Sequence, residues 1–442
     1  MQMQNYFYAI ADYIDTQIHN GETTLAYLSA EESDFVRFNK NAVRQAGSVK
    51  QLMLTLSLIN NHRRAESRIS LSGERENDQA WVKSTLEALR RDLGDLPEDP
   101  YLLFNQTPQS SEHIGDSKLP SNADMLDQVM SRGRDKDLVG LFASGVIYKG
   151  FANSLGQRNW HRADNFNFEW CLYHTADKAV KNSYAGTHWS DADFARRMAA
   201  SSAQLEILKR PPKILQPGQY RAYLAPAAVN EIVGLLSWGG FSVKSQRNKQ
   251  SPLIKLEDGA MALHSSVSLG ECSRDGIAPG FQADGFLKAP DVSLIAGGRH
   301  TGSLISPRSA REFGIDNNGA NAAEAPEALD MAAGAMQRDA MLKSLETGLL
   351  IGNLHYLNYS DRMACRMTGM TRFATFWVEN GEIQAPLNVM RFDDSVYRLL
   401  GDNLLGLTEE RDLIVDSGSY GERSTASARL PGALVKNFAL TL

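Results

Sequence analysis

Gln51-Leu-Met-Leu-Thr-Leu-Ser-Leu-Ile59 is the clearest strand signal in the N-terminal half of the chain. Leucine occupies every second position, so an extended backbone places four leucines on one face. Helical spacing occurs on both sides of this stretch, over the first twenty residues and again from Asp78 to Leu93. For the second helix we expect Asp78 as the N-terminal cap and Gly94 as the stop. Helices and strands therefore mix in this part of the chain.

The same alternation predicts another strand from Phe166 to Tyr173, where aromatic residues alternate with Asn167, Glu169 and other residues of a wet face. A helix is expected next, capped by Ser190. Prolines at 211, 212 and 217 then interrupt regular structure. We therefore expect two domains: an N-terminal α+β domain over residues 1–212 and a second domain over residues 213–442.

Short strands separated by turn residues dominate the second domain. After a helix expected over Ala227–Ser237, the best example is a hairpin whose strands are Phe373–Val378 and Ile383–Phe392, joined by the turn Glu379-Asn-Gly381. The Ala-rich tract over 320–340 permits either a helix from Glu324 or an irregular surface segment. The predicted fold class is α+β, with a β-rich, antiparallel, barrel-like or sandwich-like C-terminal domain.

The composition excludes several classes of protein. The 442 residues include 46 Lys and Arg and 52 Asp and Glu. The resulting formal charge of -6 disfavours nucleic-acid binding. No apolar run approaches the roughly 20 residues that a membrane-spanning helix needs. The start, Met1-Gln-Met-Gln-Asn-Tyr-Phe-Tyr8, lacks the pattern of a secretory signal, so we expect a cytoplasmic protein. Cys171, Cys272 and Cys365 are too widely spaced for a metal knuckle and are expected to be buried and reduced.

Familiar catalytic motifs are missing from the sequence. It contains no Gly-Lys dipeptide for a Walker loop, no Gly-x-Gly-x-x-Gly after a strand, and no Gly-x-Ser-x-Gly elbow. None of the nine histidines forms a His-x-His or His-x-x-x-His pair, so the local sequence offers no zinc site.

Asn230-Glu-Ile-Val-Gly-Leu235 resembles a metal motif without its ligands. In the TldD/PmbA family, also called TldD/TldE and once described as modulators of DNA gyrase, the zinc-bearing subunit carries His-Glu-x-x-x-His at this place. The present chain keeps Glu231 and Gly234, but Asn230 and Leu235 stand where the histidines are expected. An amide and an aliphatic side chain do not replace two imidazoles as zinc ligands.

Further blocks that are similar to the family's pattern follow in the family's order over more than 350 residues. The most specific is Phe376-Trp-Val-Glu-Asn-Gly-Glu-Ile383, which resembles its Ile-Glu-Asn-Gly-x-Ile hairpin. The others lie at 32–47, 137–140, 150–156, 274–276, 286–302, 306–311 and 348–351.

The resemblance implies a cytoplasmic TldD–TldE heterodimer that cleaves peptides or unfolded polypeptides, with zinc on the TldD side only. A cysteine near the C-terminus completes that zinc site in TldD. The corresponding stretch here is Asp416 to Arg423, and Tyr420, Ser417 or Ser419 occupies the cysteine's place. The resemblance therefore implies no metal, no cofactor and no assured catalytic residue in this chain, with zinc in a TldD-like partner.

Three functional hypotheses follow. The first is a PmbA/TldE-like subunit that supports proteolysis by a zinc-bearing partner, with Glu231 as an ordinary surface residue instead of a retained acid or base. The second is a stand-alone metallopeptidase with a rearranged site that uses His264, His300 or His355. The third is a homodimeric, non-enzymatic scaffold that binds a peptide during its maturation.

Overall fold

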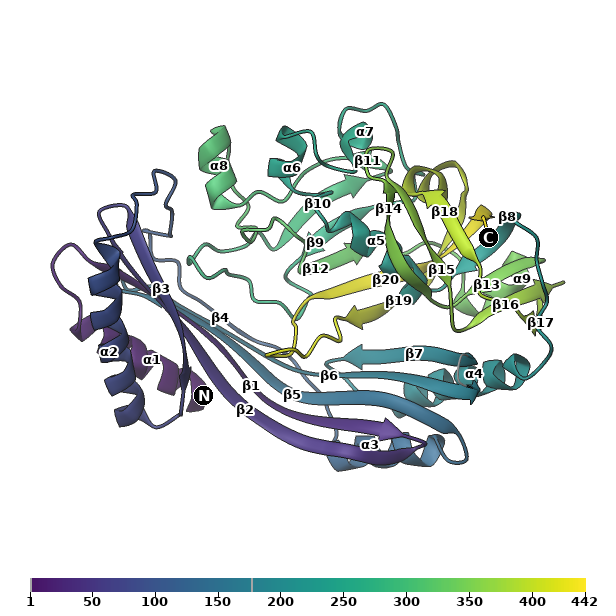
Figure 1. Cartoon of the computed structure of the whole chain (residues 1–442), viewed down its shortest axis with the longest axis horizontal. Coiled ribbons are helices and arrows are strands. Elements are labelled where there is room, and N and C mark those ends of the chain that lie inside the picture. The colour runs from purple at the N-terminus through teal and green to yellow at the C-terminus, as the bar shows by residue number, and fades with distance from the viewer. Residues whose placement is uncertain (1, 176–177) are drawn as a thin grey trace.

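Two large sheets, one in each half of the chain, make up most of the structure (Figure 1). The computed structural model describes residues 2–175 and 178–442, so Met1 of the N-terminal stretch lies outside it. Helices cover one side of the first sheet, and the second half of the chain lies across the other side. The predicted α+β class is confirmed.

Over the described residues the first sheet has seven strands, in the order β3-β2-β1-β5-β6-β4, and β7 also pairs with β6. All of its pairings are antiparallel except that of β4 with β6. The strands are β1 (Thr23–Asn39), β2 (Ala42–Asn60), β3 (Arg63–Leu71), β4 (Ser111–Ile114), β5 (Asp137–Asn153), β6 (Arg158–Thr175) and β7 (Lys178–Gly186).

Alternation along β2 and β6 builds the core under this sheet. The four leucines of β2 between positions 52 and 58 are at most 3% exposed and pack with α1 (Gln2–Thr16) and α2 (Arg75–Leu93). Toward the other end, the aromatic face of β6 packs with α3 (Asn122–Arg132) and α4 (Asp191–Leu208). The helices thus take up the apolar face, because burying those side chains is the main driving force for packing. The second half of the chain packs across the other face, where Phe281 and Ile277 also make apolar contacts with the first sheet.

The second sheet is mixed and has thirteen strands in the part of the chain that the structure describes. Its main path is β11-β10-β9-β12-β20-β8-β13-β16-β17, and β14, β15, β18 and β19 branch from it through β20. The strands are β8 (Gly218–Leu224), β9 (Leu269–Cys272), β10 (Asp291–Ala296), β11 (Arg299–His300), β12 (Ala328–Met331), β13 (Gly348–Ile351), β14 (Leu354–Asp361), β15 (Arg366–Thr371), β16 (Thr375–Glu379), β17 (Glu382–Pro386), β18 (Arg391–Ser395), β19 (Leu404–Val415) and β20 (Ser427–Leu440).

Short helices surround this sheet. Two of its pairings are parallel, β8 with β13 and β12 with β20, and over the described ranges it does not close into the barrel that the sequence suggested as one option. The helical segments are α5 (Pro226–Leu236), α6 (Val243–Arg247), α7 (Ile254–Glu257), α8 (Pro307–Phe313), α9 (Met341–Leu345), a 3-10 turn (Arg338–Ala340) and a π-helical turn (Arg398–Asp402).

Several local predictions are corrected by tertiary contacts. Asp78 is not the cap of α2 but lies inside its first turn, where its buried carboxylate accepts hydrogen bonds from Tyr6 and from the backbone of Ser72 and Gly73. The second strand of the hairpin ends at Pro386 and does not continue to Phe392.

The Ala-rich tract holds the short strand β12, and no helix begins at Glu324. Glu324 has a φ of 51°, which breaks a helix, and its carboxylate accepts hydrogen bonds from Ser242 and Ser306. All three cysteines are free, and only Cys365 is fully buried, because Cys171 lies on the wet face of β6 and Cys272 on the short strand β9.

Candidate functional site

A pocket of about 340 Å³ lies where the two halves meet. One wall is the helix α5, the opposite wall is formed by β6 and β7, and the end of β19 with the residues after it closes a third side. The residues that the sequence analysis singled out on α5 and after β19 are about 180 positions apart in the chain, and the fold brings part of each set to this pocket.

Helix α5 directs one polar edge into the pocket. Pro226 occupies its first turn, where no backbone N–H partner is needed, and Ile232, Val233 and Leu236 are buried on its inner side. Asn230, Glu231 and Gly234 line the pocket, together with Ala227 one turn earlier.

Leu235 does not reach the pocket. Its side chain is 4% exposed and belongs to the apolar core of the second half. Asn230 and Leu235, five positions apart, therefore face different surroundings, as the helical period of 3.6 residues requires.

The opposite wall carries charged residues that the sequence analysis did not propose as part of a site. Glu169 on β6 and Lys181 on β7 form an ion pair there, and Asn167 donates a hydrogen bond of 3.3 Å to the carbonyl of Val415. The wet face of the 166–173 alternation was visible in the sequence and contained Asn167 and Glu169. Nothing local indicated that this face would meet α5.

Glu231 is the ionisable residue of α5, and its pKa is shifted by the pocket. Within the described part of the chain no hydrogen bond or ion pair joins its carboxylate to another group. The Glu231 side chain is exposed at the surface, but the walls of the pocket partly desolvate its carboxyl. This desolvation raises the pKa of the Glu231 carboxyl above its usual range. Lys181 opposes this rise and Glu169 adds to it. The carboxyl is thus available to accept or donate a hydrogen bond.

The segment after β19 contributes Asp416 and Ser417 to the pocket. Ser419 borders two neighbouring hollows instead, and Tyr420 is fully exposed. Of the three candidates for the cysteine's place, only Ser417 shares a pocket with Asn230 and Glu231.

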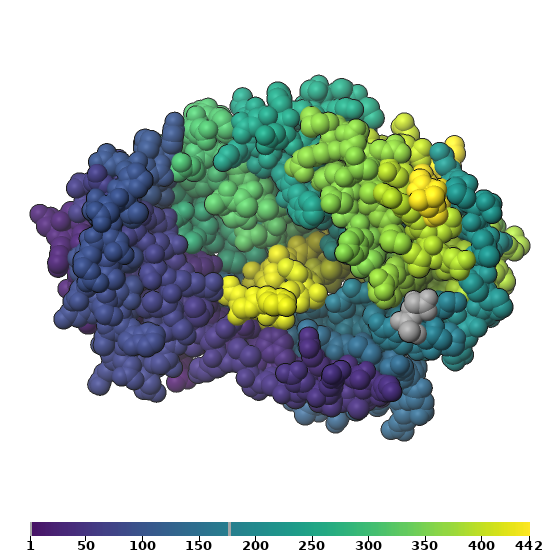
Figure 2. Space-filling model, viewed as in Figure 1, coloured from purple at the N-terminus to yellow at the C-terminus, as the bar shows by residue number. Residues whose placement is uncertain are grey.

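This segment, residues 416–426, is tied to the polar face of the first sheet. Figure 2 shows it as a yellow ridge between the purple N-terminal strands and the green part of the second half. Arg423 is 5% exposed and donates hydrogen bonds to Asn165, to Ser33 and to the carbonyl of Gly145. Glu422 accepts from Ser29 and forms an ion pair with the buried Lys149 at 3.4 Å. These contacts anchor Glu422 and Arg423, the later part of the segment, to the first sheet.

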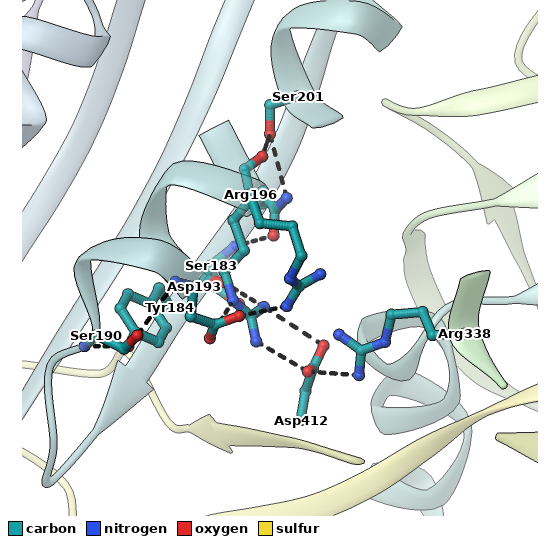
Figure 3. Close-up of polar contacts among 10 residues, drawn as sticks. Ser183, Tyr184, Ser190, Asp193, Arg196, Ser201, Arg338 and Asp412 are labelled. Atoms are coloured by element: carbon teal, nitrogen blue, oxygen red, sulfur yellow. Dashed lines mark hydrogen bonds and ion pairs between the residues drawn. The ribbon is translucent and has the colours of Figure 1, made fainter. Parts of the chain in front are cut away.

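A second link between the halves holds β19 beside the pocket (Figure 3). Asp412 on β19 accepts hydrogen bonds of 2.9 Å from Arg197 on α4 and from Arg338. Arg197 also pairs with Asp193 at 3.2 Å within α4. Burial alone would raise the pKa of Asp412, but the two guanidinium groups overcome it and hold that pKa below its ordinary value.

The donor set at the pocket does not fit a zinc ion. Zinc in proteins takes thiolate, imidazole and carboxylate ligands, usually three or four together. Here the positions in question hold an amide at Asn230, a core methyl group at Leu235 and a hydroxyl at Ser417. Among the residues that the structure describes, no group of three or more His, Cys, Asp or Glu has an arrangement that could hold a metal ion.

The histidines of the rearranged-site hypothesis lie away from this pocket. The ring of His264 contacts Ser266, the ring of His300 contacts Gln246 and Ser303, and His355 contacts Arg372. None of the three lines the pocket.

Comparison with known proteins identifies the family. The model of the PmbA/TldA metallopeptidase C-terminal domain matches residues 217–441, just over half of the chain. The chain belongs to the PmbA/TldD family. No curated protein sequence matches it. None of the helices over the described residues combines the length and the apolar composition of a membrane span.

Three solved structures share the fold over the full length. TldE from Thermococcus kodakarensis superposes with a TM-score of 0.78 at 12% identity, covering 99% of this chain and 100% of that one. A proposed modulator of a DNA gyrase from Thermotoga maritima gives 0.75 at 13%, with coverage of 99% and 100%. Another from Bacteroides thetaiotaomicron gives 0.71 at 14%, with coverage of 99% and 98%. At these identities the likeness concerns the fold alone.

Proposed function

We propose that this chain is the metal-free, PmbA/TldE-like subunit of a two-subunit cytoplasmic peptidase. A TldD-like partner supplies the zinc and the hydrolytic chemistry. This chain completes the chamber that holds the peptide or unfolded polypeptide during its cleavage or maturation. The observation that supports this proposal most directly is the orientation of α5, which presents Asn230 to the pocket and places Leu235 in the core.

The pocket supports a binding role. Four asparagines, at positions 167, 182, 230 and 353, line it, and each amide offers both a donor and an acceptor to a peptide backbone. Three of these amides already make hydrogen bonds within the protein, whereas the contacts of the described residues leave the side chain of Asn230 unused. Together with Glu231 it forms the open polar edge of α5. The positions of His264, His300 and His355 away from this pocket count against the stand-alone metallopeptidase.

The first test is the metal content of the purified chain. We expect far less than one zinc per chain by inductively coupled plasma mass spectrometry, after expression in zinc-supplemented medium. Stoichiometric zinc that is lost on changing Asn230, Glu231 or Ser417 would refute the proposal.

The second test is a cleavage assay with a reduced, carboxymethylated polypeptide as substrate. The chain alone should leave it intact, and adding a zinc-bearing TldD-like homologue should produce cleavage that a chelator abolishes. Glu231→Gln should retain at least half of that activity, as should the matched surface control Glu206→Gln. Binding without cleavage in the presence of the homologue would instead support the scaffold hypothesis.

A further inference from the structure

The sequence contains three Asn-Gly dipeptides, and the fold places them in different surroundings. They are Asn20-Gly21, Asn318-Gly319 and Asn380-Gly381. Asparagine is chemically labile before glycine, because the glycine nitrogen attacks the carboxamide carbon and no Cβ obstructs its approach. The attack needs a free carboxamide and a free N–H on the following residue. Hydrogen bonds to either group therefore slow the reaction.

Asn20-Gly21 leaves both reacting groups free. The pair forms the turn between α1 and β1, and both residues are exposed. Among the described residues, no hydrogen bond reaches the carboxamide of Asn20, and the N–H of Gly21 donates none. The turn is instead held by its neighbours: the N–H of His19 donates to the Glu22 carboxylate at 2.9 Å, and the N–H of Glu22 donates to the His19 carbonyl at 3.1 Å. The reactive pair is thus presented to water on a fixed turn.

Asn318-Gly319 is locked at every reacting group. The carboxamide of Asn318 donates to the carbonyl of Ser303 at 2.7 Å and accepts from the N–H of Ile305 at 2.9 Å. The N–H of Gly319 donates to the side chain of Asn317 at 3.1 Å, and Gly319 is buried. Three hydrogen bonds must break before the nitrogen meets the carboxamide carbon.

Asn380-Gly381 is intermediate. It forms the turn of the hairpin between β16 and β17, where Asn380 is exposed. The N–H of Gly381, however, donates to the carbonyl of Glu346 at 2.7 Å. One hydrogen bond must therefore break at this pair, and none at Asn20-Gly21.

We propose that Asn20 is a site of spontaneous deamidation in the folded chain, and that the fold protects Asn318 and Asn380 from the same reaction. The nitrogen of Gly21 forms a bond to the side-chain carbonyl carbon of Asn20, and the bond from that carbon to the side-chain nitrogen breaks. The proton of the Gly21 N–H passes through solvent to the leaving nitrogen, which departs as ammonia. Water then opens the cyclic imide at one of its two carbonyls and leaves aspartate or isoaspartate. This inference does not depend on the proposed peptidase role.

Either product changes the turn between α1 and β1. A carboxylate replaces a neutral amide two residues before Glu22, whose own carboxylate pairs with Arg90 of α2 at 2.8 Å. The isoaspartyl product also adds one carbon to the backbone, because the chain then runs through the former side chain. The class of enzyme that recognises this product is a carboxyl methyltransferase specific for isoaspartate.

Peptide mapping by mass spectrometry, after incubation of the folded chain at pH 8, tests the ranking of the three pairs. The Asn20 peptide should gain the mass that accompanies replacement of NH2 by OH roughly tenfold faster than the Asn380 peptide, since one hydrogen bond must first break at the second site. The Asn318 peptide should react slowest. An isoaspartate methyltransferase with labelled methyl donor reports the isoaspartyl product directly. Asn20→Gln should remove most of that signal, because the larger imide ring closes far more slowly, and the matched control Asn380→Gln should leave it nearly unchanged.

The same chain unfolded in guanidinium chloride shows whether the fold sets the ranking. Without their hydrogen bonds the three pairs should react at similar rates, so the advantage of Asn20 should disappear. Equal rates at Asn20 and Asn380 in the folded chain would overturn the proposal. So would an advantage of Asn20 that persists unchanged in the denaturant, because the neighbouring sequence and not the fold would then set the rate. None of these outcomes concerns zinc content or peptide cleavage, so failure here is distinct from failure of the proposed function.

Discussion

Asp412→Asn tests whether the buried ion-pair network holds the two halves together. Asp412 accepts one 2.9 Å hydrogen bond from Arg197 and another from Arg338, and the three side chains are only 13–19% exposed. The asparagine keeps the shape and one acceptor oxygen but loses the charge. Each guanidinium thereby loses its charge partner, and at roughly 1 kcal/mol for each of the two ion pairs the expected loss is about 2 kcal/mol.

Asp412→Ala should cost more, about 3–5 kcal/mol, because both guanidinium groups then lose their shared carboxylate in a buried setting. Arg197 keeps Asp193 at 3.2 Å, which places the expected loss at the lower end of that range. Urea unfolding followed by tryptophan fluorescence measures the change, since Trp170 and Trp189 pack against Phe194 of α4. The matched control is Glu206→Gln, whose ion pair with Lys209 is exposed and contributes less than about 1 kcal/mol.

The pH dependence follows from the lowered pKa of Asp412. A carboxyl whose pKa is lower in the folded than in the unfolded state stabilises the fold fully above its unfolded pKa of about 4. That contribution disappears as the pH falls through the folded-state pKa. The difference between the wild-type chain and Asp412→Asn should therefore be constant from pH 8 to pH 5 and shrink below about pH 4. A loss no larger than that of the control, or one that persists unchanged at low pH, would refute the reasoning.

Three further predictions concern the anchor, the core and the pocket. Arg423→Met removes the guanidinium that donates to the carbonyls of Gly145 and Asn165, which should lower the free energy of unfolding by about 1–3 kcal/mol. Chymotrypsin should then cleave faster after the exposed Tyr420. An unchanged cleavage rate would show that Arg423 does not hold the segment 416–426 in place. Leu54→Ala truncates a fully buried side chain of β2 and should lower the free energy of unfolding, measured by urea titration, by about 2–5 kcal/mol. The control Val43→Ala, at the exposed end of the same strand, should change it by less than about 0.5 kcal/mol. Glu231→Gln should leave the urea unfolding midpoint equal or slightly higher at pH 8, because a carboxyl with a raised pKa destabilises the fold once it is charged. The difference from the wild-type chain should vanish toward pH 4. A lower midpoint at pH 8 would reveal a group that stabilises the charged carboxylate.

Local signals predicted the individual elements well. The alternation in β2 and β6 placed their apolar faces correctly, and Ser190 caps α4 as expected, with its hydroxyl accepting from the N–H of Asp193. Periodicity works here because each strand or helix needs only to present one face to a core. Where a single residue had to be assigned a role, as with Asp78, the prediction was wrong because the hydrogen-bond partners came from distant elements.

The site was predicted only in part for the same reason. Asn230, Glu231 and Gly234 follow one edge of a helix, and the sequence drew attention to them through a resemblance. Glu169, Lys181 and Asp416 share their pocket but come from two other parts of the chain. No spacing in a linear sequence states that β7 and the end of β19 will face the same helix.

The sequence by itself determined which residues are apolar at strand or helix spacing, and with them the α+β class. Its motifs, such as Asn230–Leu235 and Phe376–Ile383, carried the resemblance to the family. It also settled that no imidazole stands at position 230 or 235. Only the tertiary structure decided that Leu235 turns into the core, that Ser417 and not Tyr420 reaches the pocket, and that residues 42–51 remain an open edge. The physical reason is that periodicity is a short-range property of the backbone, whereas a pocket or a free edge depends on which distant surfaces pack together and which are left uncovered.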